Sequence, residues 1–278
     1  MKYIILNADD FGFGQPCNRA IAKLLEFGIL GSTSVMSNMP GAEAAVRSAL
    51  GSLMVPDFGL HVCLNERFLV TPGLVSLRLN ERSLNDQVAL LDQCSHHSLL
   101  SEMSAQLELL RVFGADPSHL NVHYHLHLFV PAVTRALIEL GNKAQLPIRW
   151  FTDEATQEMS SYLKYLNVSD VERRIDLANR LVEDSRVQTI PSETSFYERD
   201  ASFETLLRIV TNAPEGKVLE ITCHPADGAM EGDSYSDFRA QEYQLLKSTP
   251  VKELIACPGV TWGSFRSSRR FIDNGTKS

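Results

Sequence analysis

Short apolar runs alternate with amphipathic segments along most of this 278-residue sequence, and this alternation constrains the fold more than any other feature. Runs typical of buried strands occupy residues 3–6, 34–36, 58–64, 148–151 and 218–222. Apolar residues at helical spacing predict helices near residues 21–27, 41–50, 99–113, 130–140, 171–182, 203–210 and 241–247. Because parallel strands need crossover connections, the pattern predicts a mostly parallel sheet flanked by helices. It leaves open whether the sheet closes into a barrel.

The domain organisation follows from what the sequence lacks. There is no internal repeat, flexible linker or block of like charge, so we expect a single α/β domain. Residues 66–98 are polar and rich in turn-forming residues, which predicts a loop insertion over one face. The polar residues 267–278 are expected to form a frayed tail.

Composition excludes several classes of protein. Hydrophobic residues make up 44% of the chain and charged residues 22%, as in globular rather than disordered proteins. A formal net charge of −8 disfavours nucleic-acid binding, and no apolar run approaches the ~18 residues of a membrane span. The N-terminus does not read as a signal peptide. Because the five cysteines are scattered without a CxxC pair, a cytoplasmic location is expected.

Two adjacent acids, Asp9 and Asp10, follow the first apolar run. In α/β folds, ligand-binding groups lie at the C-terminal ends of the strands, where this pair is placed. Two neighbouring buried carboxylates need a cation or a shared proton. The pair is therefore a candidate cation site; the alternative is a solvated turn in which one acid caps the next helix.

The histidines are placed unevenly. His61 lies in the predicted strand 58–64, where it is either a metal ligand or a hydrogen-bonded core residue. His123, His125 and His127 alternate, so a strand would place all three on one side, and a helix would place the first and last one turn apart. Imidazole and carboxylate together are the ligands of a catalytic divalent metal site. An exposed histidine patch is the alternative.

Further polar residues lie at or near the ends of other predicted strands. His224 follows the run 218–222 and precedes Pro225, where an imidazole can serve as general acid or base, or simply form a turn. Glu220 lies four residues before it. Arg149 follows Ile148 and is expected either to orient a catalytic acid or bind a substrate oxygen, or to lie on the surface.

Four short motifs, in order along the chain, resemble those of the YdjC-like carbohydrate deacetylases, a family that includes chitooligosaccharide deacetylase and the hopanoid-associated deacetylases. They are Asn7-Ala8-Asp9-Asp10-Phe11-Gly12, Gly59-Leu60-His61, the alternating histidines 123–127, and Glu220-Ile221-Thr222-Cys223-His224-Pro225. The resemblance extends from residue 3 to about residue 265. One departure is Asn121-Val122-His123, where the family usually has Asp-Ser-His; we expect the lost acid to remove a partner of a ligand imidazole.

The resemblance implies a single deacetylase domain over residues 1–266, folded as a distorted (β/α) TIM-like barrel. It implies one divalent metal ion, Mg²⁺ by the family's usual assignment or else Zn²⁺, held by Asp10, His61 and His123. The expected substrate is an acetylated amino sugar, oligosaccharide or glycoconjugate. A cytoplasmic homodimer is also implied.

The mechanism expected from this resemblance is amide hydrolysis by metal-activated water. Asp9 is expected to act as the base, and His224 to protonate the departing amine. The remaining four polar residues are expected to support the ligands or contact the substrate: His125, His127, Arg149 and Glu220.

Two other functions fit part of this pattern. A different metal hydrolase, such as a phosphoesterase, would use the same residue types, but such sites usually hold two metals about 3.5–4 Å apart. A non-catalytic metal- or carbohydrate-binding protein on the same scaffold would have no need of a free base such as Asp9. Asn121 is the residue that favours the non-catalytic alternative.

Overall fold

Seven parallel strands close into a barrel in the computed structural model, which describes residues 1–52 and 56–275. In order around the ring they are β1 (Lys2–Phe11), β2 (Ser32–Val35), β3 (Phe58–Val62), β4 (Leu120–Val122), β5 (Ile148–Phe151), β6 (Thr189–Glu193) and β7 (Val218–Cys223). The ring closes because β1 pairs with β7 along residues 3–8 and with β2 from Asn7 onward. A short strand, β8 (Val260–Trp262), pairs with the N-terminal end of β1. The expected TIM-like barrel is confirmed.

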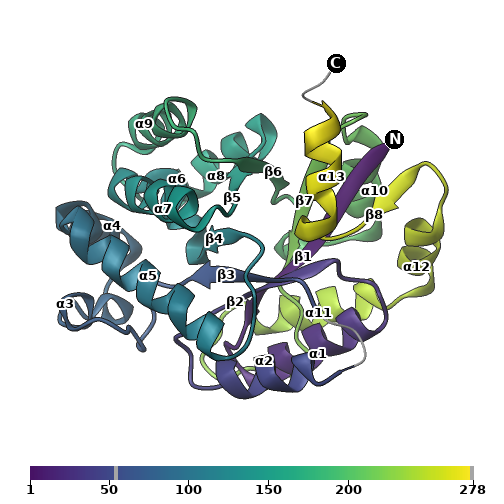
Figure 1. Ribbon diagram of the computed structural model, residues 1–278, viewed down its shortest axis with the longest axis horizontal. Helices are drawn as coiled ribbons and strands as arrows, with labels where there is room; N and C mark the ends of the chain where they lie inside the picture. The colour runs from purple at the N-terminus through teal and green to yellow at the C-terminus, as the bar shows by residue number, and fades with distance from the viewer. Residues whose placement is uncertain (53–55, 276–278) are drawn as a thin grey trace.

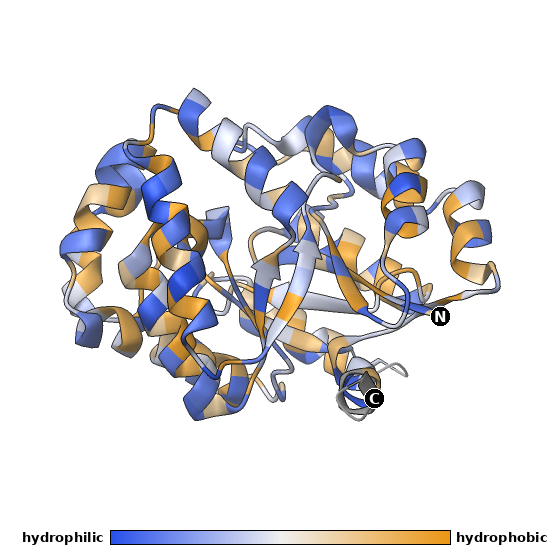
Figure 2. Cartoon of the chain, turned by 90° about the horizontal axis from the view of Figure 1, so that it is seen from above, coloured by the Kyte–Doolittle hydropathy of each residue, from blue (hydrophilic) through white to orange (hydrophobic). Residues whose placement is uncertain are grey.

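Helices surround the strands (Figure 1). They are α1 (Gln15–Glu26), α2 (Ala42–Leu50), α3 (Pro72–Val75), α4 (Leu84–Gln93), α5 (His96–Val112), α6 (Leu126–Phe129), α7 (Pro131–Ala144), α8 (Asp153–Tyr165), α9 (Val171–Glu183), α10 (Phe203–Asn212), α11 (Ser236–Leu246), α12 (Thr249–Ala256) and α13 (Phe265–Gly275). Short 3₁₀ turns are η1 (Leu79–Glu81), η2 (His123–His125) and η3 (Glu198–Asp200). Hydrophilic and hydrophobic residues alternate along the helices, as expected for elements with one face on a core (Figure 2). Among the described helices, none is long and apolar enough to cross a membrane.

Strand β1 shows how the barrel places a polar site above an apolar base. Successive side chains of a strand point to opposite faces. Ile4, Leu6 and Ala8 belong to the main hydrophobic core, whereas Tyr3 and Ile5 join a separate cluster. The same face continues to Asn7 and Asp9, both fully buried. One face of β1 therefore changes from apolar to polar toward its C-terminal end.

The expected loop insertion at residues 66–98 is wrong, because the structure has α3, η1, α4 and the start of α5 there. Two serines explain the difference. The side chains of Ser83 and Ser95 accept hydrogen bonds from backbone amides in the first turns of α4 and α5. Val88 and Leu91 of α4 are buried, which stabilises a helix whose exposed face is polar.

The segment expected to be a frayed tail overlaps helix α13, which spans Phe265–Gly275. Residues 267–275 continue helix α13, and its first residue, Phe265, is buried beneath the barrel. The ring of Phe271 lies 5.0 Å from that of Tyr3 in β1. Residues 276–278 lie outside the described residues.

Candidate active site

Asp9 and Asp10 both reach the mouth of the barrel because the end of β1 is irregular. In a regular strand these neighbours would point to opposite faces. The pairing of β1 with β2 shifts register between Ala8 and Phe11, and Asp10 has a left-handed backbone (φ 67°). Asp is among the residues that tolerate this conformation best. Both carboxylates are consequently buried at one site.

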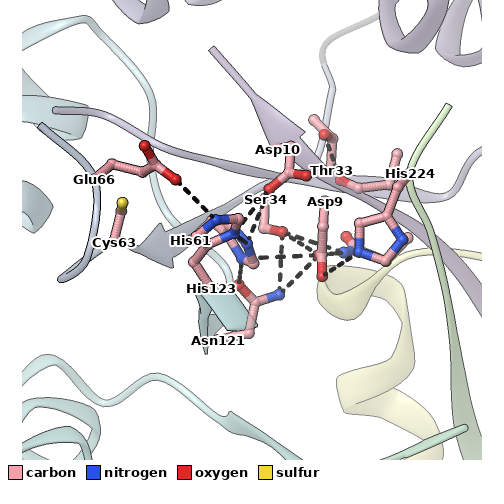
Figure 3. Close-up of polar contacts among 12 residues, drawn as sticks. Asp9, Asp10, Thr33, Ser34, His61, Cys63, Glu66, Asn121, His123 and His224 are labelled. Atoms are coloured by element: carbon pink, nitrogen blue, oxygen red, sulfur yellow. Dashed lines mark hydrogen bonds and ion pairs between the residues drawn. The ribbon is translucent and has the colours of Figure 1, made fainter. Parts of the chain in front are cut away.

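Asp10, His61 and His123 form the group most suited to a metal ion (Figure 3). Asp10 Oδ1 lies 3.2 Å from His61 Nε2 and 3.2 Å from His123 Nδ1, and the two nitrogens are 3.2 Å apart. Asp10 Oδ1 is buried and accepts no well-formed hydrogen bond from the described residues. Metal–ligand distances of about 2.0–2.2 Å place neighbouring ligand atoms at roughly this spacing. The three residues therefore fit one divalent cation.

Protonation of His123 reflects the same geometry. Burial lowers the pKa of this imidazole, but the Asp10 carboxylate and the nearby Glu66 raise it to about 9. Glu66 Oε1 lies 3.6 Å from His123 Nε2, on the side away from Asp10 (Figure 3). A cation bound between Asp10 and His123 would compete with that proton, because metal binding requires a neutral imidazole.

Asn121, the central residue of β4, sets the tautomer of His61. Its Nδ2 donates to Asp9 Oδ1 (3.2 Å) and Ser34 Oγ (3.1 Å), so its Oδ1 faces His61 Nδ1 at 2.6 Å. An amide oxygen only accepts hydrogen bonds, so Nδ1 carries the proton and Nε2 offers its lone pair toward Asp10. The expectation that Asn121 deprives a ligand imidazole of its partner is wrong, because the amide oxygen remains an acceptor.

Arg149 holds Asp9 in place from across the barrel. Its Nη1 donates to Asp9 Oδ2 (2.6 Å) and its Nη2 to Asp9 Oδ1 (2.8 Å). The same guanidinium donates to both carboxylate oxygens of Glu220. Burial raises the pKa of Asp9, but Arg149 and His61 lower it by a larger amount. The net pKa of Asp9 therefore lies well below its ordinary value. Asp9 is thus ionised and fixed, and Arg149 lies buried against it rather than on the surface.

His224 lies beside Asp9 at the end of β7. Its Nε2 is 3.8 Å from Asp9 Oδ2, and its backbone N–H donates to Glu242 Oε2 at 2.5 Å. Burial lowers the pKa of His224 to about 4. The imidazole is therefore neutral at neutral pH, and it must gain a proton before it can donate one.

The alternating histidines follow neither of the expected geometries. After His123, Tyr124 and His125 adopt left-handed backbone conformations in η2. The chain then enters helix α6, which contains His127. His125 lines the active-site cleft, whereas His127 is fully buried with its ring 5.5 Å from those of Trp150 and Phe151. The site thus contains His123 and His125, while His127 packs in the core.

Arg239 and Glu242 are site residues that the sequence motifs do not predict. Arg239 Nη2 lies 2.8 Å from Asp10 Oδ2, which leaves Asp10 Oδ1 facing the two imidazoles. Burial raises the pKa of Asp10, but Arg239 and His123 lower it well below its ordinary value. Arg239 and Glu242 share the buried face of α11 with Leu246. Charged residues at this helical spacing from a core leucine were the available signal.

A cavity of about 640 Å³ opens over these residues. Its volume is typical of small-molecule sites. Asp9, His61, His123 and His224 lie along its floor, and its walls carry four tyrosines: Tyr124, Tyr162, Tyr197 and Tyr235. The rings of Tyr197 and Tyr235 stack at 4.6 Å beside His224.

The fold and the site define an α/β-barrel protein with a buried Asp-His-His group at the C-terminal ends of its strands. The family model described as YdjC-like protein matches residues 3–256, and the chain belongs to this family. A carbohydrate deacetylase from Thermoanaerobacter pseudethanolicus is 30% identical over 92% of this chain and 94% of the relative. A chitooligosaccharide deacetylase from Salmonella typhimurium is 28% identical over 95% of this chain and 98% of the relative.

A solved structure is similar in fold. A crystal structure from Enterococcus faecalis V583, described as a candidate cellobiose-phosphate cleavage protein, aligns with a TM-score of 0.74 at 24% identity. The alignment covers 96% of this chain and 98% of the other. This similarity supports the barrel fold assigned above.

Proposed function

We propose that this protein is a metal-dependent carbohydrate N-deacetylase, which hydrolyses the N-acetyl group of an amino sugar, oligosaccharide or glycoconjugate. The observation that carries the proposal is the pairing of a potential metal group, Asp10, His61 and His123, with a separate fixed carboxylate, Asp9. The names of the relatives reported above support a sugar substrate.

Asp10 Oδ1, His61 Nε2 and His123 Nδ1 are the atoms that would hold the metal ion. When bound, a divalent cation supplies positive charge that acidifies water and polarises the acetyl carbonyl. Two imidazoles and one carboxylate are a donor set that suits Zn²⁺ better than Mg²⁺, which prefers oxygen ligands. We therefore favour Zn²⁺ over the family's usual Mg²⁺.

Asp9 is the proposed proton acceptor. Its Oδ1 accepts hydrogen bonds from Asn7, Ser34 and Asn121 as well as Arg149, so this oxygen is fully used. Its Oδ2 accepts only the bond from Arg149 among the described residues, which leaves lone-pair capacity at that atom. Oδ2 is therefore the atom to which the attacking water would lose its proton.

His224 is the proposed proton donor to the departing sugar amine. Because the resting imidazole is neutral, the proton must first arrive at Nε2, which lies 3.8 Å from Asp9 Oδ2. Transfer from Asp9 to His224 would place the proton of the attacking water on His224. His224 would then donate this proton to the leaving nitrogen. Glu242 holds the backbone of His224 in place for this step.

The competing functions fit the site less well. Two-metal phosphoesterases need ligands for a second metal ion about 3.5–4 Å from the first. Among residues 1–52 and 56–275, Asp10, His61 and His123 form the single potential metal group. A binding-only protein would gain nothing from a buried ion pair that keeps Asp9 charged beside that group.

Acetate release from a panel of N-acetylated sugars tests the proposal. The panel includes free, lipid-linked and nucleotide-linked sugars, together with a phosphate ester as the rival substrate. Acetate release from one sugar class would support the proposal. Release of phosphate alone, or of neither product by metal-loaded protein, would contradict it. The cytoplasmic location and the homodimer remain proposals; light scattering on the purified protein tests the dimer.

A further inference from the structure

His224, the proposed proton donor, lacks the hydrogen bond that usually orients an acid–base histidine. Such a histidine is commonly aimed by an acceptor on its second ring nitrogen. Here Nε2 faces Asp9 Oδ2 at 3.8 Å (Figure 3), but the buried Nδ1 has no hydrogen-bond partner among the described residues. The orientation of this imidazole must therefore come from contacts to its backbone and to its ring.

The backbone of His224 is fixed on helix α11. Its N–H donates to Glu242 Oε2 at 2.5 Å, and its carbonyl oxygen accepts a hydrogen bond from Arg239 Nη1 at 3.4 Å. Two residues further on, the N–H of Ala226 donates to the backbone oxygen of Arg239 at 3.1 Å. Glu242 is 0% exposed, so its carboxylate contacts protein rather than solvent. The turn after β7 therefore follows the position of α11 and of the Glu242 carboxylate.

The hydroxyl of Tyr235 fixes that carboxylate in turn. It donates to Glu242 Oε1 and accepts a hydrogen bond from the backbone N–H of Glu198 at 2.9 Å. Burial and the adjacent Glu242 raise the pKa of Tyr235, so the hydroxyl keeps the proton that it donates. One hydroxyl thus joins the loop after β6 to the helix that anchors His224.

The aromatic rings of Tyr235 and Tyr197 contact the imidazole directly. The two tyrosine rings stack with their centroids 4.6 Å apart. Both meet the ring of His224 edge-on, Tyr235 at 5.8 Å and Tyr197 at 5.5 Å. Aromatic rings favour this geometry over face-to-face contact, so the stacked pair restricts rotation of the imidazole.

We propose that Tyr235 is a positioning residue for His224. Its hydroxyl fixes Glu242, which holds the His224 backbone, and its ring keeps the imidazole turned toward Asp9. Tyr235 transfers no proton itself, because its single hydroxyl proton is donated to Glu242. This inference rests on the proposed function and deepens it: protonation of the departing amine depends on a tyrosine that lies outside the path of the proton.

Kinetics of Tyr235→Phe test this role, because the substitution removes the hydroxyl and keeps the ring. Misplacing a catalytic group by about 1 Å can cost about 100-fold in rate. On the best N-acetylated sugar we expect kcat to fall about 10- to 100-fold, with KM nearly unchanged because the ring still lines the cleft. Tyr243→Phe is the matched control and should keep the wild-type kcat. Tyr243 lies on the same helix, is partly buried and does not line the cleft.

Combining Tyr235→Phe with His224→Ala separates positioning from a general structural effect. If Tyr235 acts through His224, its loss costs nothing once the imidazole is absent. The double variant should therefore release acetate as fast as His224→Ala alone. A general structural effect would instead slow the double variant further.

Hydrogen–deuterium exchange measures the same contacts without turnover. Peptides covering residues 218–226 should exchange faster in Tyr235→Phe than in the wild-type protein, because the turn after β7 loses its support. Peptides covering β3 should exchange at the wild-type rate, which shows that the barrel is intact.

Each outcome decides for or against the proposal. A wild-type kcat in Tyr235→Phe, a double variant slower than His224→Ala, or unchanged exchange at residues 218–226 would each overturn it and leave the deacetylase function standing. If the wild-type protein released acetate from no sugar, the proposed function would fail. Exchange alone would then decide whether Tyr235 positions His224, with faster exchange in support and equal exchange against it.

Discussion

Replacing Arg149 with methionine tests the claim that one guanidinium neutralises two buried carboxylates. Arg149, Asp9 and Glu220 are all 0% exposed, and the guanidinium donates four hydrogen bonds of 2.5–2.9 Å to the two acids. Methionine keeps much of the side-chain volume but leaves both carboxylates without their cation. Breaking one buried ion pair costs about 3–5 kcal/mol, against a total stability of about 5–15 kcal/mol. With a shift of about 2–4 °C per kcal/mol, Tm should fall by roughly 10 °C.

The loss should depend on pH. In the wild-type protein the pKa of Asp9 is lowered, so its stabilising contribution is present above the ordinary carboxyl pKa and is lost as pH falls. In the variant, burial without Arg149 raises the pKa of both acids, so the cost disappears as they protonate on acidification. The protonation of the acids in the variant narrows the stability difference above the ordinary carboxyl pKa, and the loss in the wild-type protein narrows it further below that pKa.

Urea unfolding followed by circular dichroism at pH 7.5 and pH 5.0 measures this difference. We expect a smaller difference at the lower pH. The double variant Arg149→Met, Glu220→Gln should be more stable than Arg149→Met alone, because it leaves one stranded charge fewer. An equal loss at both pH values, or a double variant less stable than the single one, would show that Arg149 does not neutralise these two carboxylates.

Substitutions at three further positions separate the roles proposed within the site. Asp9→Asn should reduce acetate release about 10²- to 10⁴-fold while metal content by elemental analysis stays at the wild-type level; loss of the metal would show that Asp9 is a ligand instead. His123→Ala should lose the metal as well as activity, and a variant that retains stoichiometric metal would remove His123 from the ligand set. Asn121→Leu should weaken metal binding about 10- to 100-fold by calorimetry, and Asn121→Asp much less, since it keeps an acceptor for His61; equal affinities in both would argue against tautomer control.

Much of the fold is predictable because its signals are local. The strands β1, β3 and β7 are largely apolar and buried on both faces, and the crossover helices carry apolar residues at helical spacing. β4 spans three residues, which is too short for any periodicity to register. β6 contains Pro191 among polar residues, and its pairing depends on its neighbours rather than on its own composition.

The site residues that could be predicted are the acids and histidines at or near the ends of apolar strands. Asp10, His61 and His123 converge because three parallel strands end at the same edge of the barrel. Arg239 lies outside the strands, and only the packing of α11 brings it to Asp10. The separation of His125 from His127 depends on two left-handed residues that no periodicity encodes.

The most direct test of the metal site is acetate release from the best substrate before chelation, after chelation, and after addition of Zn²⁺ or Mg²⁺, with His61→Ala assayed in parallel. We predict that chelation abolishes release by the wild-type protein, that one of the two cations restores it, with Zn²⁺ more effective, and that His61→Ala stays inactive throughout. Full release by protein shown by elemental analysis to be metal-free would contradict the assignment of Asp10, His61 and His123 as a catalytic metal site.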